Sequence, residues 1–148
     1  MTTASAPHVA FIRHIAPVVA GATVTLLLIV VTDRWLIARG VLPGAGLPSY
    51  GTASLALAAA YRALFAILGC HMAARLAPKG RPRLPYAMAL GVVMVLLNVT
   101  AASSMWGQTP RWYPLMGIAL PLPCALIGGA TAVRAIAARQ AGRGRAEI

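Results

Sequence analysis

Four long apolar stretches dominate this sequence and decide what the chain can fold into. Each holds the roughly 20 apolar residues that a helix needs to cross the hydrocarbon core of a bilayer, and they cover residues 13–38, 52–77, 85–106 and 112–138. None of them alternates apolar and polar residues in the way a half-buried strand does. The sequence therefore predicts an all-α integral membrane protein, built as an antiparallel four-helix transmembrane bundle.

The composition indicates that lipid, rather than water, surrounds these stretches. Hydrophobic residues make up 59% of the 148 residues and charged residues only 10%, whereas an ordinary soluble domain is about 25% charged. One small core cannot bury this much apolar surface. The excess is therefore expected to face a lipid bilayer.

The segments between the stretches are rich in glycine and proline, which do not continue a helix. In chain order they read RGVLPGAGLPSYG, PKGRPRLP and GQTPR. The last two are so short that the helices they join must be antiparallel neighbours. No internal repeat is visible, so residues 1–148 are expected to form a single transmembrane domain, with a basic cytoplasmic tail over residues 139–148.

The basic residues are distributed unevenly across the predicted membrane. Only Arg34, Arg39 and Arg111 fall on one side, while nine fall on the side of the termini: Arg13, Arg75, Lys79, Arg81, Arg83, Arg134, Arg139, Arg143 and Arg145. Cytoplasmic segments carry an excess of Lys and Arg, so we expect both termini in the cytoplasm. The bias toward arginine and alanine is typical of a GC-rich bacterial genome, which predicts a multi-pass protein of the bacterial inner membrane.

The two membrane surfaces are predicted to use different side chains. Basic residues on the cytoplasmic side are expected to contact lipid headgroups, and these are Arg75, Lys79, Arg81, Arg83, Arg139, Arg143 and Arg145. Aromatic residues mark the opposite surface, because tryptophan and tyrosine favour headgroup depth; they are Trp35, Tyr50, Trp106, Trp112 and Tyr113.

The net charge of +11 raises the question of nucleic-acid binding. No stripe of alternating basic and aromatic residues is present for bases to stack on, so we expect no nucleic-acid partner. The expected partners are the lipid bilayer and either a partner membrane protein or further copies of the chain in a homo-oligomer.

One arginine lies well inside an apolar stretch. Arg62 follows Tyr61 in the segment AAAYRALFAILGCHMAARLAP, and a charge at that depth needs a partner or a path to water. Asp33 is the only acidic residue outside the C-terminal tail, and Asn98 lies at nearly the same depth as Arg62. We therefore expect an intramembrane polar cluster of Asp33, Tyr61, Arg62 and Asn98.

Three roles for this cluster fit the sequence. It locks the helices in register, or Arg62 extends toward the headgroups, or the cluster binds a ligand. At a similar depth, Pro121 and Pro123 each remove a backbone donor, which predicts a helix kink in the fourth stretch.

Small residues recur at spacings of three and four in the second and fourth stretches. They are Ala59, Ala63, Ala66, Gly69 and Ala73, and then Gly128, Gly129, Ala130 and Ala132. Such spacings let helix backbones approach closely. Packing within one chain and association of two chains both fit this pattern.

The sequence holds no recognisable catalytic motif. It has no Gly-rich phosphate loop, no HExxH and no CxxC, and its two acidic residues exclude a pair of catalytic carboxylates, since one lies in the tail. His14 and His71 would have to be brought together for a haem, without any specific spacing that indicates one. We expect no catalytic residue, metal or cofactor, and a protein that is not an enzyme.

Three segments carry a resemblance: YRALFAILGCHMAARLAPKGRP, ALGVVMVLLN and WYPLMGIALPLPCALIGG. Together they resemble a family of small bacterial four-transmembrane-helix proteins with no assigned activity. In that family a Tyr-Arg pair begins the second half of the second span, and WYP opens the fourth. The resemblance implies a multi-pass membrane protein and supplies no functional residue.

Two functions agree with these features. The first is a non-enzymatic accessory or structural membrane subunit that binds partner helices or lipid. The alternative is a small oligomeric transporter or channel-like protein that binds an anion near Arg62.

Overall fold

Helices form throughout the apolar stretches, because a backbone in lipid must satisfy its hydrogen bonds within its own segment. The computed structural model describes residues 7–42, 51–107 and 109–146. The helices are α1 (Pro7–Ala38), α2 (Thr52–Leu76), α3 (Leu84–Met105), α4 (Trp112–Ala119) and α5 (Pro121–Ala146). The predicted all-α four-helix bundle is confirmed, with the fourth stretch divided into α4 and α5.

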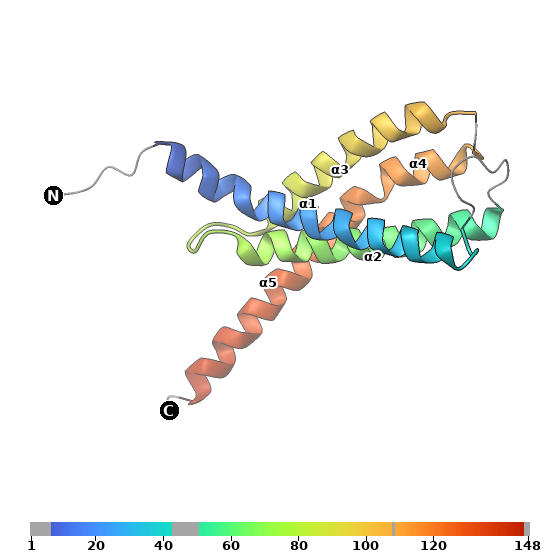
Figure 1. The fold of residues 1–148 in the computed structure, drawn as a ribbon. Helices are drawn as coiled ribbons and strands as arrows, with labels where there is room; N and C mark the ends of the chain where they lie inside the picture. Colours follow the sequence, from blue (N-terminus) through green and yellow to red (C-terminus); the bar gives the residue numbers. More distant parts are fainter. Residues whose placement is uncertain (1–6, 43–50, 108, 147–148) are drawn as a thin grey trace.

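Within the described residues, four helical segments are long and apolar enough to cross a membrane. They are Ile12–Ala38, Thr52–Leu76, Leu84–Ser104 and Trp112–Gly142. Successive segments run in opposite directions, so the start of α1 and the end of α5 lie toward the same end of the bundle (Figure 1). We call this the terminal end, and we call the opposite end, where α1 leads into α2 and α3 into α4, the connection end.

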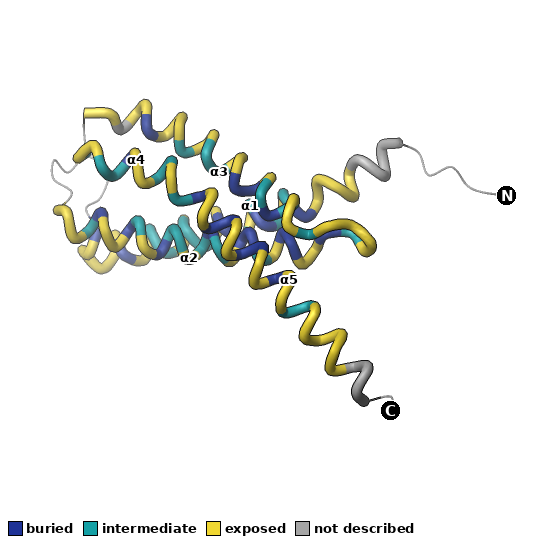
Figure 2. Tube along the Cα trace, turned by 180° about the vertical axis from the view of Figure 1, so that it is seen from behind, coloured by how far each residue is buried: buried dark blue, intermediate teal, exposed yellow. Residues whose placement is uncertain are grey.

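Many large apolar side chains remain exposed along these helices. Val31 is 65% exposed, Leu64 60% and Leu96 62%, and exposed residues run along the outside of every helix (Figure 2). Contiguous apolar surface of this kind is unfavourable in water and favourable against lipid tails. The exposed surface therefore agrees with a transmembrane protein.

The core consists mainly of very small residues. Its fully buried members are Cys70, Ala73, Ala74, Ala87, Leu90, Ala125 and Ala132, and it lies toward the terminal end. A Cβ atom added at Gly21 would lie 2.5 Å from the Gly69 carbonyl oxygen, and one added at Gly69 would overlap the Thr25 hydroxyl. The backbones of α1 and α2 are therefore in direct contact at this crossing.

The fourth stretch packs through small residues in the same way. A Cβ atom at Gly128 would overlap the Ile67 carbonyl oxygen of α2, and one at Gly129 would lie 2.6 Å from the Leu84 side chain of α3. These close contacts are all made within one chain. Gly69 of α2 and Gly128 and Gly129 of α5 thus pack against other helices of the same chain, whereas Ala130 is exposed.

The division between α4 and α5 falls at Leu120. Leu120 N–H still donates to Met116 O at 2.9 Å, and Cys124 N–H donates to Leu120 O at 3.1 Å. Pro121 and Pro123 have no N–H to continue the ladder between these bonds. The helix path bends here, and the last turns of α5 extend away from the other helices (Figure 1).

Candidate functional site

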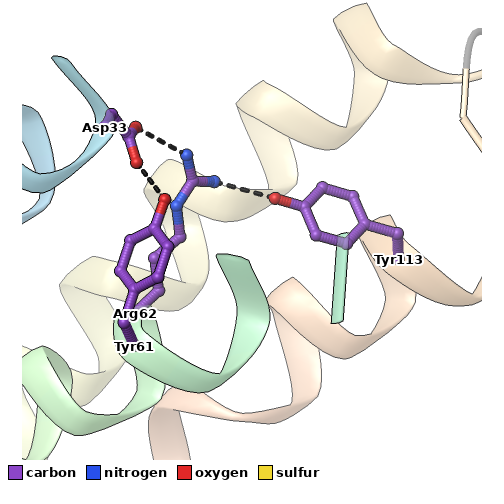
Figure 3. Close-up of polar contacts among 4 residues, drawn as sticks. All are labelled: Asp33, Tyr61, Arg62 and Tyr113. Atoms are coloured by element: carbon purple, nitrogen blue, oxygen red, sulfur yellow. Dashed lines mark hydrogen bonds and ion pairs between the residues drawn. The ribbon is translucent and has the colours of Figure 1, made fainter. Parts of the chain in front are cut away.

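An ion pair joins α1 to α2 in the half of the bundle nearer the connection end. Arg62 Nη2 donates to Asp33 Oδ2 at 2.8 Å. The other carboxylate oxygen, Asp33 Oδ1, accepts a hydrogen bond from the Tyr61 hydroxyl (Figure 3). The one acidic residue of the spans is therefore shared by two neighbouring side chains of α2.

A second tyrosine extends this cluster to α4. Arg62 Nη1 donates to the Tyr113 hydroxyl at 3.0 Å, on the side of the guanidinium away from Asp33 (Figure 3). The sequence predicts Tyr113 only as an interfacial aromatic residue. The available signal was its position as the second residue of α4, within reach of a long arginine side chain that extends toward the connection end.

The Arg62 side chain is partly exposed, and one of its hydrogen-bond donors has no acceptor in the described part of the chain. It is 41% exposed, and the Asp33 side chain is 25% exposed. The Arg62 Nε is buried and has no acceptor among the described residues. An unmet buried donor costs on the order of 1–3 kcal/mol.

Asn98 lies near this cluster and bonds elsewhere. Its Nδ2 donates to Met94 O of the preceding turn at 2.8 Å. Its Oδ1 faces α4, because a Cβ atom added at Gly117 would lie 3.2 Å from it. The structure thus brings Asp33, Tyr61 and Arg62 together, while the Asn98 amide donates within α3.

A pocket of about 310 Å³ adjoins the ion pair, and we call it the Arg62 pocket. Its lining residues come from α1 and α2 on one side and from α3, α4 and α5 on the other. Toward the connection end, α3 and α4 diverge from α1 and α2 (Figure 1). All five helices contribute to the pocket wall, which is mostly apolar. The polar side chains in that wall are Thr25, Arg62, Asn98 and Tyr113.

The two prolines predicted to kink the fourth stretch differ in their surroundings. Pro121 is buried and lines the Arg62 pocket, whereas Pro123 is exposed. Pro121 also lies against α3, because a Cβ atom at Gly91 would lie 3.3 Å from its carbonyl oxygen. The break therefore shapes the pocket wall where α4 passes into α5.

The basic residues predicted to contact headgroups lie mostly on exposed surface at the terminal end. Arg75, Lys79, Arg81 and Arg139 are exposed. Arg83 is partly buried, and its Nη1 donates to Arg75 O at 3.2 Å, so it satisfies a carbonyl at the end of α2. The side chains of Arg143 and Arg145 lie outside the described residues.

The histidines and cysteines whose side chains the structure describes do not gather into a site. Within the described part of the chain, no group of three His, Cys, Asp or Glu side chains could hold a metal ion. His14 Nδ1 lies 2.6 Å from the Tyr86 hydroxyl, while His71 Nδ1 lies 3.0 Å from Thr131 Oγ1. The structure thus gives these two histidines separate partners.

Comparison of the chain with protein-family models, with curated proteins and with solved structures finds no match. The resemblance to a family of small bacterial four-span proteins therefore stays a prediction.

Proposed function

We propose that this chain is a non-enzymatic accessory protein of the bacterial inner membrane that binds a lipid-like molecule in the Arg62 pocket. The observation that carries this proposal is the pocket itself, which is partly enclosed, mostly apolar and about 310 Å³ in volume. Ligand sites have volumes of about 300–1,000 Å³ and combine apolar walls with a few orienting polar groups. Within a bilayer, the molecule that best fits such a cavity is an amphiphile.

The proposed orientation rests on the distribution of charge. The terminal end carries the larger share of the basic residues, so both termini are assigned to the cytoplasm. The Arg62 pocket then lies in the half of the bundle that faces away from the cytoplasm.

The alternative, an oligomeric transporter or channel for an anion, has weaker support. Asp33 already neutralises Arg62 at 2.8 Å, and an anion added to a neutral pair would bring an uncompensated charge into a low-dielectric site. Of the small residues that could join copies of the chain, Gly69, Gly128 and Gly129 are in contact with its own helices.

Native mass spectrometry tests the proposal on the full chain purified in a mild detergent. We expect a lipid-like molecule to remain bound to the unmodified chain. Ala63→Phe should remove it, because Ala63 lines the pocket, and Ala60→Phe should retain it, because Ala60 is exposed on α2 outside the pocket. Equal binding by both variants would contradict the proposal, and anion efflux from liposomes that hold the chain would favour the transporter.

A further inference from the structure

The Arg62 pocket changes in polarity along the membrane normal. Its polar side chains near the connection end are Arg62, Asn98 and Tyr113. Its deeper part is bounded by residues such as Leu90 and Cys124, which lie farther from the connection end than Asn98 on α3 and Tyr113 on α4. One end of the pocket therefore suits a polar group, and the other end suits hydrocarbon.

The deeper part contains one hydroxyl, and that hydroxyl is occupied. Thr25 Oγ1 lies 3.0 Å from Gly21 O and 3.2 Å from Phe65 O, and Thr25 is fully buried. This side chain therefore offers no donor to a ligand, so nothing at the inner end competes with an alkyl chain.

The polar end offers donors without net charge. The Asp33–Arg62 pair is neutral overall, and Tyr113 and Asn98 are uncharged. Burying a net anion or cation next to a neutral pair leaves one charge uncompensated in a low-dielectric environment, which is costly. The site therefore disfavours ligands that carry net charge.

The direction of the polarity matches one leaflet. A lipid in the leaflet at the connection end has its headgroup at that surface and its chains toward the bilayer centre. Tyr113 lies near that surface, since it is the second residue of α4, and the Arg62 side chain reaches its hydroxyl from the eleventh residue of α2. Their N–H and O–H groups are suited to the ester carbonyl and phosphate oxygens of a lipid.

We infer that the Arg62 pocket holds one acyl chain of a zwitterionic diacyl phospholipid from the leaflet at the connection end. Arg62 and Tyr113 bind the glycerol-ester and phosphate region, and the chain extends past Asn98 toward Leu90 and Cys124. This inference rests on the proposed function, because it names the ligand of the same pocket.

The test uses the delipidated full chain, titrated with dioleoyl phosphatidylethanolamine and, separately, with dioleoyl phosphatidylglycerol, and followed by native mass spectrometry. Both lipids have the same chains and differ in net charge. The binding of interest is the part that is lost when Ala63 is replaced by Phe. For that part, we expect the zwitterionic lipid to be preferred by about fivefold or more. Equal binding, or a preference for the anionic lipid, would overturn the inference and leave the proposed function intact. If Ala63→Phe binds the two lipids as well as the unmodified chain does, the inference and the proposed function are both overturned.

Asp33→Asn supplies a second arm, because it leaves Arg62 with a net positive charge. The preference should then shift toward phosphatidylglycerol by about fivefold or more, and an unchanged ratio would contradict the electrostatic argument. The third arm needs no substitution. A phosphatidylethanolamine with a diazirine near the end of one chain should label peptides that contain Leu90 or Cys124, and labelling restricted to lipid-exposed residues such as Leu96 would overturn the inference.

Discussion

Asp33 and Arg62 lie 29 residues apart in the chain, and their side chains meet at 2.8 Å between α1 and α2. The same guanidinium reaches Tyr113 on α4 at 3.0 Å. One side chain thereby joins α1, α2 and α4. This link lies in the half of the bundle where the Arg62 pocket lies between α1 and α2 on one side and α3 and α4 on the other. The ion pair is both a link between helices and a wall of the pocket.

Asp33→Asn and Arg62→Gln should each lower the free energy of unfolding, because each leaves a partner without its counter-charge in a low-dielectric site. The double variant should be less destabilised than the sum of the two single variants. We expect a coupling of about 1–2 kcal/mol, reduced from that of a fully buried pair by the partial exposure of both side chains. Reversible unfolding in mixed micelles measures all three values.

The control for this cycle is Arg39→Gln. Arg39 lies over the ring of Trp35, 5.0 Å from its centroid, on exposed surface beyond the end of α1. Its effect should add to that of Asp33→Asn without coupling. If the destabilisations caused by Asp33→Asn and Arg62→Gln also simply add in the double variant, the ion pair contributes nothing to stability.

Gly69→Ala should destabilise the bundle by about 1–3 kcal/mol, because the added methyl group would overlap the Thr25 hydroxyl and force α1 away from α2. Gly142→Ala is the matched control. A Cβ atom at Gly142 meets nothing within 4 Å, so this change should be neutral or should stabilise the helix by up to about 1 kcal/mol. Thermal unfolding in detergent compares the two, and similar effects from both would mean that the close crossing of α1 and α2 does not form.

Cys70 should resist alkylation until the bundle unfolds. Cys70 and Cys124 are both free, and they are 0% and 3% exposed. A thiol enclosed by packed helices is out of reach of a water-borne reagent. We expect no mass increase with N-ethylmaleimide in mild detergent and two additions after denaturation in dodecyl sulfate. Lys79→Cys provides an exposed thiol in the α2–α3 connection that should react at once, and equally fast modification of Cys70 would contradict the packing.

Reporter fusions in a bacterial host test the orientation. Alkaline phosphatase fused after Gly107 should be active, because the α3–α4 connection is assigned to the non-cytoplasmic side. Green fluorescent protein fused after Ile148 should be fluorescent, because the C-terminus is assigned to the cytoplasm. Phosphatase activity from a fusion after Ile148 would reverse the proposed topology, and activity at both positions would contradict the four-span arrangement itself.

Sequence alone determined the helices, because a backbone in lipid has no water to bond and each apolar stretch must satisfy its own N–H and C=O groups. That requirement is local, and it shows in residue type and in the glycine and proline between the stretches. The pairing of Asp33 with Arg62 also followed from the sequence, since Asp33 is the only acid available to a cation inside the spans. Pro121 and Pro123 likewise indicated where the fourth stretch would be interrupted.

Tertiary structure decided which faces meet. Three features depend on how each helix is rotated and tilted against its neighbours. They are the contact of Arg62 with Tyr113, the bond of Asn98 to its own helix, and the Arg62 pocket. Rotation and tilt are set by close contacts between helices, such as Gly21 against the Gly69 carbonyl. Those contacts are spread over residues far apart in the chain, so depth counting along single helices predicts the layer in which a side chain lies but not the partner that it meets.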